Sequence, residues 1–361
     1  MKRICFFIGN LNQAGGTERV ASVIASALYK NGYEVHMLSL QCGNEPFFEL
    51  VDGVFISQLF TEPGRGLLRY PITISRLRSY LKKNKIDFLI DVESMLALYA
   101  LPALIGLKIR HICWEHFNYK VDLGKASRRL ARRLAARFAD DVITLTDKDR
   151  QLWLSNTTCK AKMRAIPNPV TIERVSESVL NKEKVFLAVG RLSYQKGFDL
   201  LLKAWARVIH LHPDWRLRIV GDGEEKANLE ALRHKLNIES STELVPKTNN
   251  IAFHYQNSAF FVMSSRFEGF GLVLVEAQSY GLPIVSFDCD FGPSEIITHY
   301  ENGWLCGNEN SDALGDSLSE AAELFNTQKY YDMSSSALLS SKRFNLDKIL
   351  SYWSDLFNEK K

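Results

Sequence analysis

The sequence predicts an α/β protein made of two doubly wound domains, each a parallel sheet with helices on both faces. Its 361 residues suit two domains of about 150–180 residues each. Short apolar, β-branched runs alternate with amphipathic helical stretches, which is typical of a covered parallel sheet. This alternation stops near residue 170 and starts afresh near residue 185, so we expect a second domain there.

The first half of the chain shows six strand-like runs and five helical patterns. We expect strands near 3–9, 33–40, 86–91, 110–115, 141–145 and 163–167, and helices near 17–31, 72–84, 94–107, 125–139 and 147–155. The first helix illustrates the reasoning, because its apolar residues recur on one face and Gly32 follows it as an expected C-cap.

The second half repeats the pattern after the motif PNPV at 167–170 and a polar segment up to residue 184. We expect strands near 185–190, 216–220, 242–246, 259–263, 283–287 and 303–306, with helices between them that include 197–210, 224–236 and 271–280. The predicted domains are therefore 1–170 and 171–344, joined near 170–183. The last helix, within 345–361, completes the first domain or packs on the second.

Composition and charge exclude several classes of protein. The chain is 46% hydrophobic and 24% charged, as expected for a soluble protein, and its net charge of +4 does not indicate nucleic-acid binding. Six isolated cysteines without a CxxC pair argue against disulfides or zinc and favour the cytoplasm. The N-terminal apolar run is too short for a signal peptide, and no stretch approaches the roughly 20 apolar residues of a membrane span.

The most informative segment is SSRFEGFGLVLVEA at 264–277, a strand end followed by a glycine-containing loop and a helix. Gly269 and Gly271 allow close approach of a ligand, and the free N–H groups at the helix start, about 271–274, suit a diphosphate. Glu268 can accept hydrogen bonds from sugar hydroxyls, and Glu276 from ribose hydroxyls. As a bare pattern, a surface loop with two carboxylates explains these residues equally well.

Other segments after strands carry candidate groups. Arg191 and Lys196 in GRLSYQKG at 190–197 could offset the charge of a departing diphosphate, although a solvated turn is the commoner explanation. Gly15 and Gly16 precede the first helix, with Thr17 as a plausible N-cap. That loop lacks the GxGxxG pattern of a nicotinamide site and could be a simple turn.

Two further motifs are weaker. His116 ends the strand at 110–115, where a lone histidine is more often structural than functional, and Glu115 beside it is a weaker candidate. GDG at 221–223 could shape a nucleotide pocket or form a simple turn. In open parallel sheets ligands bind beyond the carboxyl ends of strands, so we expect all of these loops to border one cleft between the domains.

Taken together, these blocks resemble retaining glycosyltransferase family 4, which has the GT-B fold of two Rossmann-like domains facing across a cleft. The signature is Glu268 and Glu276 with seven residues between them. The agreeing blocks cover nearly the whole chain and include GTER after the first strand, WEHF at 114–117, PNPV, GRLSYQKG, GDG, GPSEII at 292–297 and NGWL at 302–305.

The resemblance implies roles for individual residues. It assigns catalysis to Glu268, His116, Arg191 and Lys196. It places the donor nucleotide sugar against Gly15, Gly16, Arg191, Lys196, Gly269, Phe270, Gly271, Leu272, Val273 and Glu276. The implied reaction is a front-face displacement without bound metal or cofactor. Lys247 departs from the family, which commonly has glycine near this position, so base recognition stays open.

The stretch 125–138 predicts a basic amphipathic helix. Lys125, Arg128, Arg129, Arg132, Arg133 and Arg137 fall on one half, and Leu130, Ala131, Leu134 and Phe138 on the other. Such a helix can rest on an anionic membrane, with about 1 kcal/mol per basic residue. We expect Arg128, Arg129, Arg132 and Arg133 to face the membrane or the acceptor; a core helix with a solvated charged face is the alternative.

The function predicted from the sequence is retaining transfer of a hexose from a UDP-sugar to a glycan acceptor in bacterial surface polysaccharide biosynthesis, such as capsule, O-antigen or lipooligosaccharide assembly. The hexose is Gal, Glc, GalNAc or GlcNAc, and the acceptor is a lipid-linked saccharide reached from the cytoplasmic face of the membrane. The alternatives are a nucleotide-sugar epimerase of the same fold, a phosphorylase with lysine-bound pyridoxal phosphate, and an inactive saccharide-binding protein.

Overall fold

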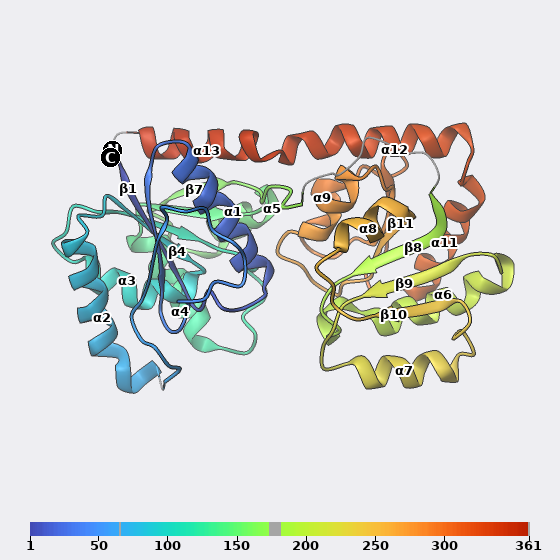
Figure 1. The fold of residues 1–361 in the computed structure, drawn as a ribbon, viewed down its shortest axis with the longest axis horizontal. Helices are drawn as coiled ribbons and strands as arrows, with labels where there is room; N and C mark the ends of the chain where they lie inside the picture. The colour runs from blue at the N-terminus through green and yellow to red at the C-terminus, as the bar shows by residue number, and fades with distance from the viewer. Residues whose placement is uncertain (65, 173–181, 360–361) are drawn as a thin grey trace. The chain divides into compact units, whose positions relative to one another are not determined.

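The computed structural model describes residues 1–64, 66–172 and 182–359, and the chain divides into two compact units. Unit 1 comprises Met1–Thr171 together with Leu346–Lys361, and unit 2 comprises Ile172–Asn345. Each unit contains a parallel sheet with helices packed on it (Figure 1), so the predicted α/β class is confirmed. Most of the expected connection at 170–183 lies outside the described residues.

Unit 1 contains a seven-stranded parallel sheet with the strand order β3-β2-β1-β4-β5-β6-β7. The strands are β1 (Arg3–Ile8), β2 (Glu34–Ser39), β3 (Phe55–Gln58), β4 (Phe88–Val92), β5 (Arg110–Trp114), β6 (Asp141–Thr144) and β7 (Lys162–Ala165). Its helices are α1 (Gly16–Lys30), α2 (Gly66–Lys83), α3 (Ala97–Leu104), α4 (Ala126–Phe138), α5 (Asp147–Asn156) and the short 3₁₀ helix η1 (Ser94–Leu96). Every residue of β4 and β5 is buried, as expected for central strands covered on both faces.

Unit 2 contains a six-stranded parallel sheet with the order β10-β9-β8-β11-β12-β13. The strands are β8 (Glu183–Val189), β9 (Arg216–Val220), β10 (Thr242–Val245), β11 (Ser258–Met263), β12 (Ile284–Phe287) and β13 (Gly303–Cys306). The helical segments are η2 (Tyr194–Lys196), α6 (Phe198–Leu211), α7 (Lys226–Lys235), α8 (Ile251–Asn257), α9 (Leu272–Ser279), α10 (Pro293–Ile296), α11 (Ser311–Leu324), α12 (Gln328–Ser341) and η3 (Lys342–Phe344). Trp205, Trp215 and Phe260 are among the buried residues of its core.

Three local predictions differ from the structure. The edge strand β3 was not predicted from the sequence. Its residues Phe55 and Ile56 are exposed, so the strand lacks the alternation of apolar and polar residues that marks a half-buried strand. Helix α2 begins at Gly66 rather than at 72 and contains Pro71, which costs one intrahelical hydrogen bond but does not end the helix. The N-cap of α1 is Gly15 and not Thr17, which lies in the first turn of the helix.

The C-terminal helix α13 (Leu346–Asn358) packs on unit 1. Its Trp353 ring lies 5.0 Å from the ring of Trp114, at the end of β5, in an edge-to-face arrangement. Arg110 donates to the carbonyl of Leu356 at 2.8 Å, and Lys2 donates to the carbonyl of Phe357 at 2.8 Å. These cations satisfy carbonyls at the helix C-terminus and favour its dipole, so α13 is held by both packing and capping.

Candidate active site

Each sheet has one point at which the direction of strand addition reverses, and this is where ligands bind in open α/β sheets. In unit 2 the reversal lies between β8 and β11, which pair in the middle of the sheet. The segments that follow these two strands are 190–197 and 264–271, the two motifs that the sequence singled out. In unit 1 the reversal lies between β1 and β4, so the loop before α1 and the residues after β4 hold the corresponding positions.

The two loops of unit 2 are tied to each other by backbone and side-chain hydrogen bonds. The Ser264 hydroxyl donates to the carbonyl of Lys196 at 2.9 Å, and the Gln195 amide donates to the carbonyl of Phe267 at 3.0 Å. Gly197 adopts a left-handed conformation with φ of 60°, and a Cβ there would lie 2.1 Å from the Ser264 carbonyl oxygen. Glycine is therefore required at 197 by both conformation and space.

Lys196 and Glu268 form an ion pair at the centre of these loops. Lys196 Nζ lies 2.6 Å from Glu268 Oε1, which also accepts a hydrogen bond of 2.7 Å from the Ser265 hydroxyl. The two side chains are 18% and 9% exposed, so the pair is largely desolvated but still open to a ligand. The neighbouring Cys289 thiol is kept protonated, because burial and then the charge of Glu268 raise its pKa to about 12.

Arg191 lies at the surface, within the 190–197 loop. Its side chain is 74% exposed, and Nε lies 3.1 Å from Glu224 Oε2. An exposed pair of this kind contributes little to stability, so the guanidinium can leave Glu224 for another anion at small cost. The structure thus places both predicted cations after β8, with Lys196 held in position and Arg191 at the surface.

Helix α9 starts beside this ion pair. Its N-cap is Gly271, with φ of 89°, and the helix begins at Leu272, so its first N–H groups fall within the predicted segment of about 271–274. Phe270 is buried against Phe344, whereas Gly269 is partly exposed. Glu276 is only 2% exposed and accepts a hydrogen bond of 3.1 Å from the Tyr255 hydroxyl.

The GDG motif at 221–223 lies against the first loop. A Cβ at Gly221 would lie 1.9 Å from the Gly190 carbonyl oxygen, and one at Gly223 would lie 2.3 Å from that of Leu192. The Leu192 N–H donates to the carbonyl of Asp222 at 2.9 Å. These glycines allow the segment after β9 to support the loop after β8, which is a stronger requirement than a simple turn would impose.

In unit 1 the predicted glycines and His116 follow β1 and β5, respectively. Gly15 caps α1, and a Cβ there would lie 2.1 Å from Glu18 Oε2, whereas a Cβ at Gly16 would have no atom of the described residues within 4 Å. The His116 ring packs on Trp114 with 4.4 Å between ring centroids, and its Nε2 is buried with no hydrogen-bond partner among the described residues. Burial lowers the pKa of His116 to about 4, so the imidazole is neutral at pH 7.

Glu115, the weaker candidate beside His116, has a fully engaged carboxylate. Its Oε2 accepts hydrogen bonds of 2.5 Å from Ser94 and 3.0 Å from Arg132, and its Oε1 accepts one of 3.0 Å from the Phe117 N–H. Glu115 therefore shapes the 115–117 turn that carries His116.

The structure corrects the expected membrane face of α4. Arg128 and Arg132 are 4% and 2% exposed. Arg132 binds Glu115 and the carbonyls of Tyr119 and Val121, and Arg128 Nη2 lies 2.5 Å from a Glu93 oxygen. Neither arginine can face a membrane, because each compensates a carboxylate at the ends of β4 and β5. Arg129 and Arg133 are exposed, as predicted.

Glu93 is a candidate that sequence reasoning missed. It directly follows β4, at the reversal point of unit 1, and has a left-handed φ of 99° that is uncommon for a residue with a side chain. Its N–H donates to the Trp114 carbonyl at 2.8 Å, and its side chain is 27% exposed. Burial and then the charge of Glu115 raise the pKa of Glu93. The signal that could have identified Glu93 is its position directly after the buried strand β4.

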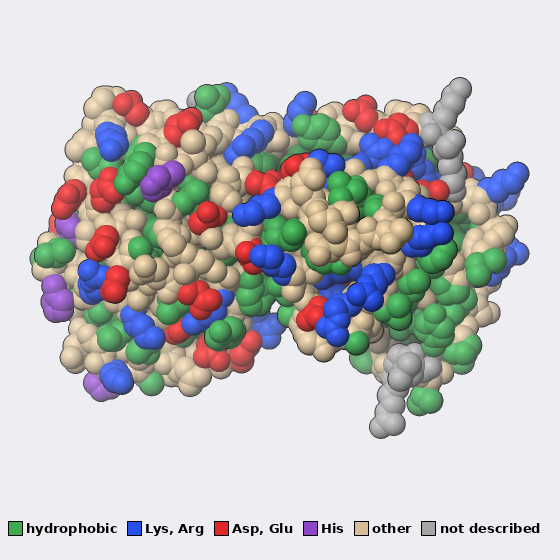
Figure 2. Space-filling view, turned by 180° about the vertical axis from the view of Figure 1, so that it is seen from behind, with side chains coloured by type: hydrophobic (Ala, Val, Ile, Leu, Met, Phe, Trp, Pro, Cys, Tyr) green, Lys and Arg blue, Asp and Glu red, His purple; other side chains and the backbone are tan. Residues whose placement is uncertain are grey.

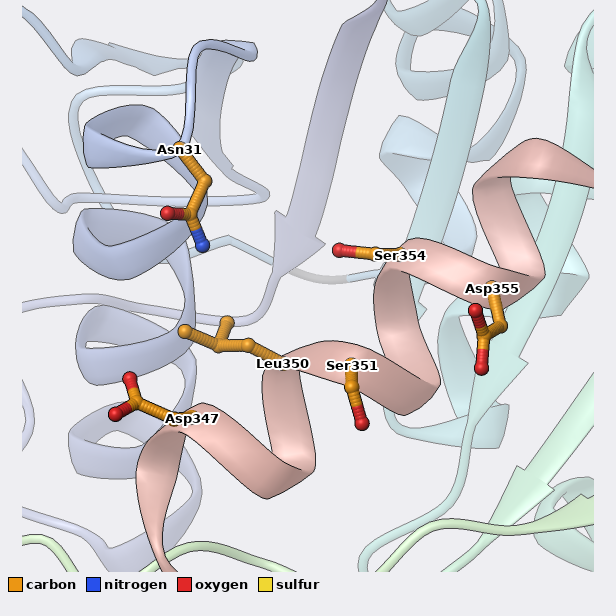
Figure 3. A pocket seen from close by; sticks show the side chains of 6 residues that line it. All are labelled: Asn31, Asp347, Leu350, Ser351, Ser354 and Asp355. Carbon is orange, nitrogen blue, oxygen red and sulfur yellow. The ribbon is translucent and has the colours of Figure 1, made fainter.

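A shallow hollow elsewhere in unit 1 lies between the end of α1 and α13 (Figure 3). It is lined by Asn31 and by polar and acidic residues of α13 such as Asp347 and Asp355, with Leu350 as an apolar member. None of these residues belongs to a loop at a strand's carboxyl end. Among the described residues, no group of three or more His, Cys, Asp or Glu could hold a metal ion, and no helix is long and apolar enough to cross a membrane.

We predict that the His116 ring does not titrate between pH 5.5 and 8, because its folded pKa of about 4 lies well below the usual value of about 6.5. As the pH falls from 6.5 towards 4, the unfolded chain takes up this proton first, so the contribution of His116 to stability decreases. Proton NMR of the imidazole tests the first point. The decrease is measured as the difference between wild type and His116→Asn, because Asp149, whose burial raises its pKa to about 7, shifts stability in the opposite direction.

Two family models match the chain, one in each half. Residues 14–174 match "Glycosyltransferase Family 4", and residues 170–335 match "Glycosyl transferases group 1". An uncharacterized glycosyltransferase of Haemophilus influenzae is 36% identical over 98% of this chain and 99% of its own length. The amylovoran biosynthesis glycosyltransferase AmsD of Erwinia amylovora is 30% identical over 99% of this chain and 100% of its own length.

A third relative and a solved structure extend the comparison. A Campylobacter jejuni α-1,4-N-acetylgalactosaminyltransferase, whose name specifies an undecaprenyl-diphosphate-linked saccharide, is 28% identical over 100% of this chain and 99% of its own length. The crystal structure of Anabaena Alr3699/HepE in complex with UDP aligns with a TM-score of 0.83 at 21% identity, covering 99% of both chains, and supports the GT-B fold. With its two halves matched and full-length relatives at 30% identity or more, this chain belongs to glycosyltransferase family 4, a family of retaining hexosyltransferases.

Proposed function

We propose that this glycosyltransferase transfers a hexose from a UDP-sugar to a lipid-linked saccharide during assembly of a bacterial surface polysaccharide. The observation that carries the proposal is the Lys196–Glu268 pair, which lies at the reversal point of unit 2 beside the start of α9. The names of the Erwinia and Campylobacter relatives support a surface polysaccharide and a lipid-linked acceptor. The UDP complex of a structurally similar protein supports the nucleotide.

The arrangement suits a donor diphosphate bound between the loop after β8 and the start of α9. Lys196, Arg191 and the N–H groups of α9 would surround the phosphates, and their positive charge would stabilise UDP as it leaves. Glu268 would accept hydrogen bonds from the hexose and Glu276 from the ribose. The acceptor hydroxyl would attack C1 on the face from which UDP departs, so the new bond forms where the old one breaks.

The unit 1 groups would act on the sugar side of this reaction. A neutral His116 can exchange hydrogen bonds with sugar hydroxyls, and it brings no charge that would oppose an oxocarbenium-like transition state. The N–H groups at the start of α1, where Gly15 and Gly16 lie, follow β1 at the reversal point of unit 1. We assign donor phosphate and acceptor contacts to this loop.

The test is a screen of UDP-, GDP- and ADP-sugars by thermal shift and by slow hydrolysis, with Glu276→Ala as the matched variant. We expect one UDP-hexose to raise the melting temperature of the wild type and to be cleaved slowly to UDP, and we expect the variant to lose both effects. Stabilisation by no nucleotide sugar would contradict the proposal. Conversion of the UDP-sugar to its epimer without an acceptor would instead favour the epimerase alternative.

We also propose that the outer face of α4 rests on the anionic membrane that holds the acceptor. The exposed residues of α4 in the structure include Arg129 and Arg133 together with Leu130 and Phe138, which are 52% and 61% exposed. Exposed basic and apolar side chains on one helix suit an anionic interface. Figure 2 shows hydrophobic side chains gathered on part of the surface of unit 1, and exposed residues of that unit also include Leu68 and Ile72 of α2.

Flotation with phosphatidylglycerol vesicles tests this second proposal. We expect Arg129→Ala/Arg133→Ala to reduce vesicle binding about 10-fold or more, since each basic residue near an anionic surface contributes about 1 kcal/mol. The control is Lys203→Ala/Arg207→Ala, which removes two exposed cations from α6 of unit 2. Equal binding of wild type and the α4 variant would show that this face does not touch the membrane.

A further inference from the structure

Arg266 lies in the 264–271 loop of unit 2, but its guanidinium contacts other segments of the unit. Its Nη1 donates to the Tyr194 carbonyl at 2.8 Å and to Asp199 Oδ1 at 2.9 Å, and its Nη2 donates to Asp199 Oδ2 at 2.8 Å. Its Nε donates to Glu309 Oε2 at 3.1 Å. A side chain that is 9% exposed therefore uses the planar fork of arginine on a bidentate carboxylate and two further acceptors.

The backbone of Arg266 and the ring of Tyr194 extend the same connection. The Arg266 N–H donates to the Gln195 carbonyl at 2.8 Å, and the Asn308 amide donates to the Arg266 carbonyl at 3.2 Å. The guanidinium carbon lies 4.1 Å from the centroid of the Tyr194 ring, within the range of a cation–π contact. One residue thus joins η2, the start of α6 and the segment after β13.

The charge of Arg266 is already compensated within the protein. Two carboxylates, Asp199 and Glu309, face this one cation. Burial alone would raise the pKa of Asp199, but the hydrogen bonds and charge of Arg266 lower it overall, so the pair stays ionised. This distinguishes Arg266 from Arg191, whose exposed pairing with Glu224 leaves it available to a phosphate.

Arg266 connects the 264–271 loop to the 190–197 loop close to both Lys196 and Glu268. Gln195, to which its N–H is bound, is adjacent to Lys196, and Glu268 follows Arg266 by two residues. Holding Tyr194 and Gln195 against Arg266 therefore sets the register in which Lys196 Nζ and Glu268 Oε1 lie 2.6 Å apart. The Cβ-free Gly197 lets the loops approach closely enough for this register.

We propose that Arg266, held by Asp199, is a positioning residue that places Lys196 and Glu268 in the geometry that binds the donor diphosphate. The identity of that ligand rests on the proposed function, whereas the positioning itself does not. Arg266 touches no reacting atom in this role. It acts through Lys196, because a loss of the connection would let the 190–197 loop move relative to the 264–271 loop.

The experiment compares Arg266→Ala, Arg266→Lys and Asp199→Asn with a matched control, Arg207→Ala. Arg207 also pairs with two carboxylates, Asp312 and Asp316, in the same unit, but on α6 and α11 away from both loops. Calorimetry with UDP and with uridine measures phosphate-dependent binding. Hydrogen exchange of peptides covering 190–199 and 264–271 measures how firmly the loops are held.

We expect Arg266→Ala and Asp199→Asn to weaken UDP binding about 10- to 100-fold, because small misplacements of a charged group have large effects. Uridine binding should not change, and exchange should become faster in both loops and not elsewhere. Arg266→Lys, which can still pair with one oxygen of Asp199, should give an intermediate result. Arg207→Ala should match the wild type throughout.

Several outcomes would overturn the proposal. Wild-type UDP affinity in Arg266→Ala would do so, even with faster exchange, because the connection would then be structural only. An equal loss of UDP and uridine binding would also contradict it. If the wild type binds no UDP, the proposed function fails. Hydrogen exchange of the two loops then tests the positioning role by itself, and unchanged exchange in Arg266→Ala rejects it. If Arg266→Ala does not fold, Arg266→Lys and Asp199→Asn decide the question.

Discussion

Replacing Lys196 with alanine should lower the rate of hexose transfer by about 100-fold or more while the protein remains folded. Removing one group that stabilises developing charge in a desolvated site typically costs about 10²–10³ in rate. Lys196 is 18% exposed and is the cation paired with Glu268, so its loss removes a positive charge from the place where UDP would leave. Steady-state rates of UDP release with the donor identified by the screen give the measurement.

The control for this variant is Lys184→Ala. Lys184 belongs to β8, as Lys196 belongs to the loop that follows it, but it pairs with Asp214 at an exposed site and should have no effect on rate. A Lys196→Ala enzyme with at least half of the wild-type rate would remove Lys196 from the catalytic assignment. The diphosphate would then depend on Arg191 and the N–H groups of α9.

Replacing Arg132 with alanine should destabilise unit 1 by about 3–5 kcal/mol, the usual cost of removing one partner from a buried ion pair. The Arg132 side chain is 2% exposed, and its loss leaves the Glu115 carboxylate, which is fully buried, without its main compensating charge. It also removes hydrogen bonds to the carbonyls of Tyr119 and Val121. Chemical denaturation monitored by tryptophan fluorescence measures the change.

Matched variants of the same helix separate burial from charge. Arg133→Ala removes an exposed arginine from α4 and should change stability by no more than about 0.5 kcal/mol. The double variant Arg132→Met/Glu115→Gln should recover part of the loss, because no unpaired charge then remains buried. If Arg132→Ala and Arg133→Ala were equally stable, Arg132 would have to be solvated in solution, and the original membrane assignment would regain support.

The basic helix shows why a pattern on one helix can mislead. A helical projection of 125–138 separates basic from apolar residues, and this predicts that the basic half faces outward. In the structure Arg128 and Arg132 face inward because Glu93 and Glu115, at the ends of β4 and β5, need partners. Leu130 and Phe138, expected on the buried side, are 52% and 61% exposed. The partners lie 17 or more residues away, so no local pattern could show them.

The sequence by itself determined the α/β class, the family and the two loops of unit 2, because these depend on local periodicity and on contiguous motifs. Strand runs, glycines that permit left-handed turns and the Glu268–Glu276 spacing are all contained in short segments. Through the family resemblance that those segments carry, Lys196 and Glu268 could be expected as candidate site residues. Their 2.6 Å pairing could not, because it joins residues that are 72 positions apart.

Only the tertiary structure decided which charges are buried, which residue caps α1 and where the last helix packs. Each of three charged residues pairs with groups from distant parts of the chain: Glu93 with Arg128, Arg132 with Glu115 and two carbonyls, and Arg266 with Asp199 and Glu309. Helix α13 joins unit 1 because Trp114 and Arg110 of β5 offer an aromatic surface and a cap for its final carbonyls. Burial free energy and charge compensation depend on such distant neighbours, and they become readable only once the chain is folded.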